Sequence, residues 1–329
     1  MRRREFITLL GGAAAAWPLP GRGQVAAQGA VKAARIGWVT AQQAASLVPY
    51  VEAMRSALAE LGYVEGRNLV IEFRFGDDAI ERVPGLAAEL VRLPVDLIVA
   101  QGATAFEIRG LGLPVPVVFS MSADPVEAGF TDSLARPRGN MTGVTLMAVE
   151  FSGKRLELLH EIVPDLRRVA ILGNPEHPGA RLERAFSDET AQRLGLTIDY
   201  RPSRTREELA NVLDTIAAHP PQAISLLADG FAIQNRQMIF DFAMRQRVPV
   251  VSGWPIFARS GAICTYGPRQ TESYRRLAYY IDRILRGAKP ADLPIERPTR
   301  EFVINQRTAR MLGLTIPPSL LVRADEVIE

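Results

Sequence analysis

Residues 95–104 read VDLIVAQGAT, and this stretch decides the fold class. Its first six residues form a short run that is almost entirely apolar, as expected for a β-strand buried on both faces. A glycine follows at Gly102, and residues 105–110 then have a helical pattern. A buried strand that leads through a tight turn into a helix is the repeating unit of a parallel α/β sheet.

The same unit recurs on either side of this stretch. Apolar runs at residues 35–39, 69–73 and 115–119 predict further strands. The segments between them carry apolar residues at helical spacing, for example Val51, Met54 and Leu58. The first half of the chain therefore predicts a parallel sheet with helices on both faces.

The pattern starts again in the second half of the chain, with predicted strands at residues 168–172, 196–200, 223–227 and 248–251. Residues 115–118 and 248–251 have the same sequence, Val-Pro-Val-Val. A repeated unit of this kind predicts two Rossmann-like α/β lobes joined by a hinge. One large doubly wound sheet is the alternative.

The predicted lobes divide the chain discontinuously. Lobe 1 is expected to span residues 28–145 and lobe 2 residues 146–266, with the hinge near residues 140–149. Further crossings are expected at residues 264–267 and 298–303, on either side of a predicted helix at 272–285. Residues 267–298 would then return to lobe 1 and residues 299–329 to lobe 2.

The N-terminus has the pattern of a secretory signal, predicted to span residues 1–27. Arg2, Arg3 and Arg4 precede an apolar run at residues 9–19, and Val25-Ala26-Ala27 supplies small residues for cleavage. Paired arginines of this kind are typical of twin-arginine export. Cys264 is the only cysteine, which excludes an internal disulfide and leaves no cysteine for a lipid anchor near the cleavage site. We therefore expect a protein free in the periplasm.

Composition argues against several classes of function. The chain has 39 basic and 36 acidic side chains, and removing residues 1–27, with four arginines and one glutamate, leaves 35 of each. This balance gives no reason to expect nucleic-acid binding. His160, His177 and His219 lack metal-ligand spacing, and no nucleophile elbow or dinucleotide-binding motif is present. We expect a monomer without cofactor or metal, and not an enzyme.

A ligand site is expected beyond the carboxyl ends of the strands, where parallel sheets bind small molecules. The residues that follow the strands are mostly small and polar, with a few aromatic rings. The predicted ligand-binding residues are Thr40, Gln42, Gln101, Gly102, Ala103, Thr104, Ser120, Ser122, Asn174, Asp229, Phe231, Trp254 and Tyr266.

Two of these positions suggest the chemistry of the ligand. Thr104 and its neighbours open a helix, whose free N–H groups favour a carboxylate. Asp229, in the other lobe, could receive an ammonium group, so that the pair would suit an amino acid. Each residue could instead cap its own helix. Trp254, Phe231, Trp38 and Tyr266 could form an apolar wall, although residues such as Trp38 and Phe231 more often belong to the core than to a pocket.

Long segments of the chain resemble a known family. Residues 122–129 and 133–143, together with the tail at 305–321, are similar to the ABC-transporter substrate-binding family that includes tryptophan- and tyrosine-type binding proteins. The resemblance implies a type I periplasmic-binding fold with the ligand held between hinged lobes. It also implies that residues 102–104 face the cleft and that Asn174 matches a family asparagine after the first strand of lobe 2. Aromatic amino acids are the class of ligand that the resemblance supports best, with other small acids or amides open.

The function expected is the periplasmic solute-binding component of an ABC importer. Ligand contacts to both lobes would favour closure about the hinge, and the closed form would deliver ligand to a permease in the inner membrane. Two alternatives remain at this point, a periplasmic sensor that feeds a receptor kinase and an α/β-class hydrolase.

Overall fold

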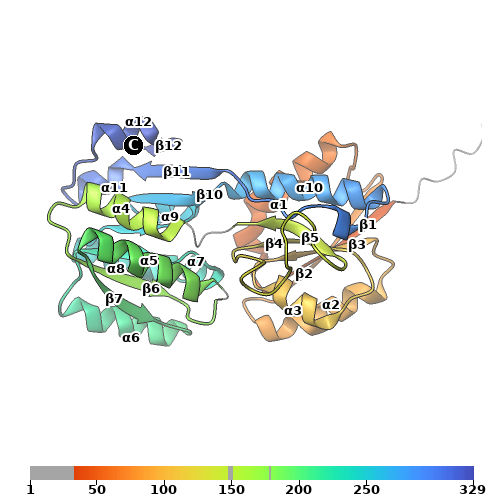
Figure 1. Ribbon diagram of the computed structural model, residues 1–329, viewed down its shortest axis with the longest axis horizontal. Coiled ribbons are helices and arrows are strands. Elements are labelled where there is room, and N and C mark those ends of the chain that lie inside the picture. The colour runs from red at the N-terminus through yellow and green to blue at the C-terminus, as the bar shows by residue number, and fades with distance from the viewer. Residues whose placement is uncertain (1–32, 147–150, 178) are drawn as a thin grey trace, which may run out of the picture. The chain divides into compact units, whose positions relative to one another are not determined.

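The computed structural model describes residues 33–146, 151–177 and 179–329 (Figure 1). The predicted signal, residues 1–27, and part of the predicted hinge lie outside the described residues. The strands of the described part form one five-stranded and one seven-stranded sheet. Each sheet with its covering helices is called a lobe below. The prediction of two separate α/β sheets is thus confirmed, and the single-sheet alternative is wrong.

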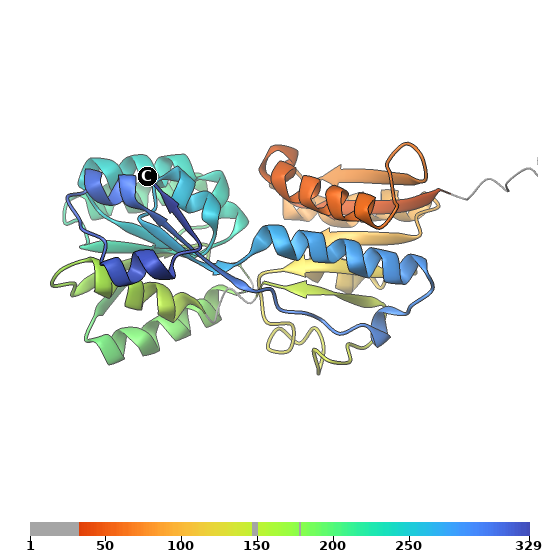
Figure 2. The same ribbon diagram turned by 90° about the horizontal axis from the view of Figure 1, so that it is seen from above.

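The first lobe is built on a parallel sheet of order β2-β1-β3-β4-β5. Apolar side chains alternate between its faces, so that Ile36 and Val99 pack under one helix pair while Val39 and Ile98 pack under the other. Helices α1 and α10 cover the first face and α2 and α3 the second (Figures 1 and 2). The strands are β1 (Ala34–Thr40), β2 (Leu69–Phe75), β3 (Leu97–Gln101), β4 (Val117–Met121) and β5 (Met141–Thr145), and the helices are α1 (Ala44–Glu60), α2 (Val83–Arg92), α3 (Thr104–Leu111) and α10 (Gln270–Leu285).

The second lobe has the strand order β12-β11-β10-β9-β8-β6-β7, and its pairs are parallel except for β10 with β11. Helices α4, α5, α11 and α12 contribute to the core on one face, and α6, α7, α8 and α9 to the core on the other. The strands are β6 (Arg168–Gly173), β7 (Thr197–Pro202), β8 (Ala223–Leu226), β9 (Val250–Ser252), β10 (Cys264–Pro268), β11 (Arg300–Asn305) and β12 (Glu326–Ile328). The helices are α4 (Ser152–Ile162), α5 (Ala180–Leu194), α6 (Arg206–Ala217), α7 (Gly230–Gln234), α8 (Arg236–Gln246), α9 (Pro255–Ser260), α11 (Gln306–Met311) and α12 (Pro318–Arg323).

Strands β5, β10, β11 and β12 were not predicted. Residues 140–149 were assigned to a hinge, yet Met141–Thr145 pairs with β4. Gly143 makes this pairing possible, because its φ is +152° and a Cβ at this position would lie 2.0 Å from the Phe119 carbonyl oxygen. The segments at 264–267 and 298–303 were expected to be crossings, but they contribute to the antiparallel pair of β10 and β11.

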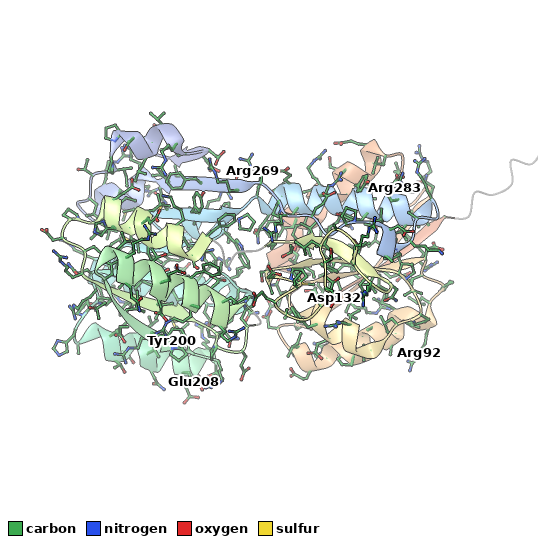
Figure 3. The ribbon with its side chains drawn as sticks, viewed as in Figure 1. Arg92, Asp132, Tyr200, Glu208, Arg269 and Arg283 are labelled. Atoms are coloured by element: carbon green, nitrogen blue, oxygen red, sulfur yellow. The ribbon has the colours of Figure 1, made fainter. Side chains whose placement is uncertain are left out.

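The segments that connect the lobes pair with one another. Arg269, which Figure 3 labels, lies where β10 leads into α10. Its backbone N–H donates to the Thr299 carbonyl oxygen at 2.8 Å. Thr145, at the end of β5, donates its backbone N–H to the Glu296 carbonyl oxygen at 2.9 Å. As a result, α10 follows a strand of the second lobe in the chain but packs against the sheet of the first.

Candidate ligand-binding site

A cavity of about 810 Å³ lies at the carboxyl ends of strands from both sheets. Its volume falls in the range of about 300–1,000 Å³ usual for small-molecule sites. Its position agrees with the rule for ligands of open parallel sheets. The predicted ligand-binding residues that line it are Thr40, Gln42, Gln101, Gly102, Ala103, Ser120, Ser122, Asn174, Asp229, Phe231 and Trp254.

Thr104 lies next to the cavity without lining it. It is the first residue of α3, and Ala103 occupies the N-cap position, so Thr104 does not cap the helix. Its fully buried hydroxyl accepts a hydrogen bond from the backbone N–H of Ala41 at 2.9 Å. Thr104 therefore fixes the loop that follows β1, and we leave it out of the proposed site.

Tyr266 and Trp38 also lie away from the cavity lining. Tyr266 is part of β10, and its ring packs edge-on against Phe151 and Phe302. Trp38 is fully buried in the core of the first lobe, where its ring stacks on Tyr274. The core interpretation of Trp38 therefore holds. Phe231 lines the cavity and also packs against the core of the second lobe.

A row of polar residues ends three adjacent strands of the first lobe. Thr40 pairs with Gln101, and Gln101 pairs with Ser120, so the three side chains share the face covered by α1 and α10. The Thr40 hydroxyl donates to Gln101 Oε1 at 2.7 Å. The buried Ser120 hydroxyl has no hydrogen-bond partner among the described residues, which leaves it available to a ligand.

Two tyrosines on the covering helices line the cavity beside this row. Tyr50 of α1 and Tyr274 of α10 stack with ring centroids 4.9 Å apart. The Tyr50 hydroxyl donates to Gln270 Oε1. Burial raises the pKa of Tyr50 to about 12 and also raises the pKa of Tyr274, so both hydroxyls are neutral donors at pH 7. The sequence did not reveal this pair, because the two residues come together only through the packing of α1 on α10.

Asp229 lies at the second-lobe side of the cavity. It is the N-cap of α7, and its Oδ1 accepts a hydrogen bond from the Ala232 backbone N–H at 2.6 Å. Its side chain is almost completely buried, and burial raises its pKa to about 7 against the opposing effect of backbone hydrogen bonds from Ala232, Asn174 and Phe231. The capping interpretation is correct, and Asp229 also lines the cavity, where a ligand ammonium would favour its charged form.

The charged side chains around the cavity are mainly acidic. The two arginines of the lining both have partners: Arg204 forms an ion pair with Glu176 at 3.3 Å, and Arg206 donates a hydrogen bond to Asn235. Acidic side chains around a cavity favour a ligand with a positively charged group over a simple anion. The acidic residues are Asp78, Glu81, Glu107, Glu176 and Asp229, and the basic ones are Arg204 and Arg206.

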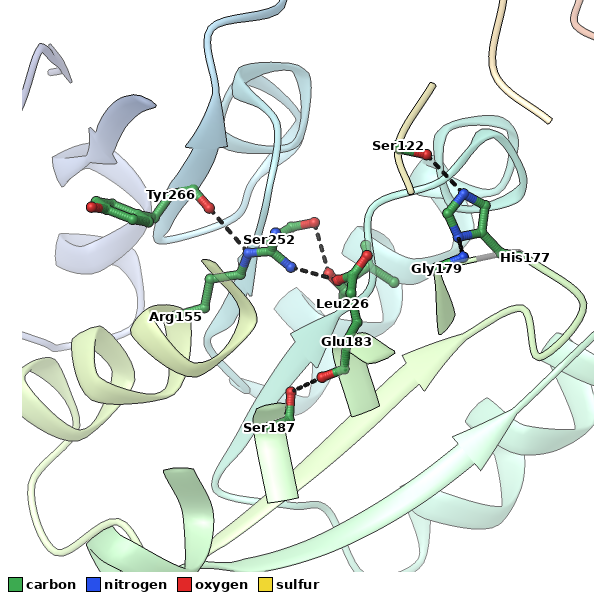
Figure 4. Close-up of polar contacts among 9 residues, drawn as sticks. All are labelled: Ser122, Arg155, His177, Gly179, Glu183, Ser187, Leu226, Ser252 and Tyr266. Carbon is green, nitrogen blue, oxygen red and sulfur yellow. Dashed lines mark hydrogen bonds and ion pairs between the residues drawn. The ribbon is translucent and has the colours of Figure 1, made fainter. Parts of the chain in front are cut away.

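His177 is a cavity residue that sequence reasoning considered only as a metal ligand. Its Nε2 lies 2.8 Å from the Ser122 hydroxyl, so that a second-lobe residue contacts a first-lobe residue (Figure 4). The residues that the structure describes contain no cluster of three or more His, Cys, Asp or Glu that could hold a metal ion. No helix in this part of the chain is long and apolar enough to cross a membrane.

Comparisons with known proteins agree with this architecture. The model of the ABC transporter substrate binding protein family matches residues 39–328. The tyrosine-binding protein of Clostridioides difficile (strain R20291) is 21% identical over 265 residues, which cover 78% of this chain and 74% of that protein.

Two solved structures share the fold. The ABC domain in complex with L-Trp from Streptococcus pneumonia is 24% identical, with a TM-score of 0.81 and coverage of 90% of this chain and 100% of that one. A conserved domain protein from Vibrio cholerae is 22% identical, with a TM-score of 0.82 and coverage of 90% and 99%. The chain has the type I periplasmic-binding fold.

The chain belongs to the ABC transporter substrate-binding protein family, because the family model spans nearly all of its described part. The family and the curated relative are binding proteins and not enzymes, and this chain is therefore a binding protein and not the alternative hydrolase.

Proposed function

We propose that the chain is the solute-binding component of an ABC importer. It binds an aromatic amino acid, or a related small acid or amide, between two lobes that close around the ligand. The proposed lobes are residues 28–145 with 267–298, and residues 146–266 with 299–329. The signal in residues 1–27 directs the protein to the periplasm without a lipid anchor, where the monomer delivers its ligand to a permease of the inner membrane.

The observation that carries this proposal is the distribution of side chains in the cavity. Tyr50 and Tyr274 present stacked aromatic rings from the first lobe, while Trp254 and Phe231 line the cavity from the second. Asp229 adds a buried carboxyl group. A ligand with a ring and an ammonium group would contact both lobes and so favour closure. The L-Trp complex and the tyrosine-binding relative support the same class of ligand.

Titration calorimetry with L-tryptophan, L-tyrosine and L-phenylalanine tests the proposal. Tryptamine, which lacks the carboxylate, and indole-3-propionate, which lacks the ammonium group, separate the two polar contacts. We expect L-tryptophan or L-tyrosine to bind, and removal of the ammonium group to weaken binding more than removal of the carboxylate. An absence of binding by all five compounds would refute an aromatic amino acid as the ligand.

Two variants test the aromatic contact. Tyr50→Leu should weaken binding of an aromatic ligand by about 2- to 12-fold, the equivalent of one lost aromatic pair. Tyr279→Leu is the matched control, since Tyr279 lies on α10 but does not line this cavity. Equal effects of the two substitutions would exclude a direct contact between Tyr50 and the ligand.

A further inference from the structure

A hydrogen bond between Ser122 and His177 joins the two lobes at the cavity. Ser122 follows β4 of the first lobe, and His177 follows β6 of the second. The Ser122 Oγ and His177 Nε2 atoms are 2.8 Å apart, and both residues line the cavity (Figure 4). Ser122 is 7% exposed, so water has little access to its side of the contact.

The second ring nitrogen of His177 determines the direction of this bond. The backbone N–H of Gly179 donates to Nδ1 at 3.2 Å, so Nδ1 acts as an acceptor and carries no proton. The proton of the neutral ring must then be on Nε2, which donates it to the Ser122 hydroxyl. Desolvation lowers the pKa of His177 to about 4, so the ring stays in this neutral form at the pH of a periplasm.

The backbones on the two sides of this bond also approach closely. A Cβ built at Gly179 would lie 2.9 Å from the Ser122 carbonyl oxygen and 3.2 Å from His177 Cε1. The first distance is too short for a Cβ beside a backbone oxygen, and the second would require a small shift of the His177 ring. Gly179 therefore leaves the space that the Ser122 loop occupies, independently of the hydrogen bond itself.

We propose that Ser122, His177 and Gly179 form an interlobe latch that stabilises contact between the lobes and slows release of the bound ligand. The latch acts by shifting the balance between separated and contacting lobes. The effect of the latch on ligand release rests on the proposed solute-binding function, whereas its effect on contact between the lobes does not. A hydrogen bond of ordinary net strength changes such an equilibrium by about 2- to 12-fold.

A double-mutant cycle tests the latch through the rate of ligand release. Stopped-flow dissociation of L-tryptophan is measured for wild type, Ser122→Ala, His177→Ala and the double variant. Each single substitution should accelerate dissociation by about 2- to 12-fold, and the double variant should release ligand no faster than the faster single variant. His177→Gln, whose amide N–H can donate in place of Nε2, should release ligand more slowly than His177→Ala. Multiplicative effects in the double variant would overturn the proposal.

A measurement without ligand separates the latch from the proposed function. Dyes attached at Arg92→Cys in the first lobe and His219→Cys in the second report the interlobe distance by single-molecule energy transfer (Figure 3 labels Arg92). The native Cys264 is buried and should remain unlabelled. Ser122→Ala and Gly179→Ala should each shift the ligand-free distribution towards longer distances.

Gly85→Ala is the matched control for Gly179→Ala, because a Cβ at Gly85 meets no atom within 4 Å. It should leave the distance distribution unchanged. An unchanged distribution for Ser122→Ala and Gly179→Ala would overturn the latch even if L-tryptophan binds. A shifted distribution without binding of any of the five compounds would support the latch and refute an aromatic amino acid as the ligand.

Discussion

Replacing Asp229 by asparagine should change how the stability of the protein depends on pH. The carboxyl group is 3% exposed and caps α7 through Oδ1. Asparagine retains an acceptor oxygen for the Ala232 N–H, so Asp229→Asn removes the ionisation while preserving the cap. The comparison of the two proteins therefore isolates the free energy of ionising this buried group.

The size of the effect follows from the pKa. Burial raises the pKa of Asp229 from 3.8 to about 7, so the folded protein holds this proton more tightly than the unfolded chain does. The resulting stabilisation is complete below pH 3.8 and is lost as the pH rises through 7. A tenfold change in proton affinity equals about 1.4 kcal/mol, so the loss amounts to about 4 kcal/mol by pH 8.

Urea unfolding at pH 4, 5, 6, 7 and 8 measures this loss for wild type and for Asp229→Asn. Between pH 4 and pH 8, the free energy of unfolding of wild type should fall by about 4 kcal/mol relative to that of Asp229→Asn. Asp241→Asn, an exposed position on α8, is the control and should follow wild type. Parallel curves for wild type and Asp229→Asn would refute the raised pKa.

Three further substitutions test packing and capping in the second lobe. Arg155→Met should lower the free energy of unfolding in urea by about 3–5 kcal/mol, because the buried Glu183 carboxylate loses the guanidinium that lies 2.9 Å away (Figure 4). The double variant Arg155→Met with Glu183→Leu removes both charges and should recover most of that loss. Gly267→Ala should lower the midpoint of thermal unfolding, because its methyl group would lie 2.0 Å from the Gly253 carbonyl oxygen, with a loss of about 1–3 kcal/mol. Thr205→Ala should cost about 1 kcal/mol in urea unfolding, because the Thr205 side chain caps α6.

Each of these predictions has an outcome that contradicts it. A double variant as unstable as Arg155→Met would show that the residual buried charge is not the cause of the loss. Gly85→Ala, in the first turn of α2 with free space around the new methyl group, should stabilise the protein by about 0.4–1 kcal/mol, because alanine reduces the conformational entropy of the unfolded chain. A similar gain for Gly267→Ala, or no change for Thr205→Ala, would contradict the described packing.

Strands buried on both faces could be predicted from the sequence, because a run such as residues 97–100 is apolar at every position. Strand β5 could not, because Thr142 and Gly143 interrupt its apolar pattern. β10 and β11 were missed for a different reason. Their antiparallel pairing joins residues 32–40 positions apart, and the surrounding parallel pattern gives no sign of it.

The candidate site was predictable where it depends on strand ends. Gln101 and Ser120 follow from the rule for parallel sheets. The direction of a side chain within a loop does not follow from it, and Thr104 points to the Ala41 backbone instead of the cavity. Tyr50, Tyr274 and His177 could not have been grouped from the sequence, because only the packing of elements distant in the chain brings them to one cavity.

The order of the chain has a consequence for synthesis on the ribosome. The five strands of the first sheet are complete at Thr145, but α10, which covers Trp38 and its neighbours, begins only at Gln270. At about 5–20 residues per second, that helix emerges about 6–25 seconds after the sheet. An apolar surface of the nascent chain is thus uncovered for that time and is available to chaperones. Neither lobe can complete its fold until nearly the whole chain has been made.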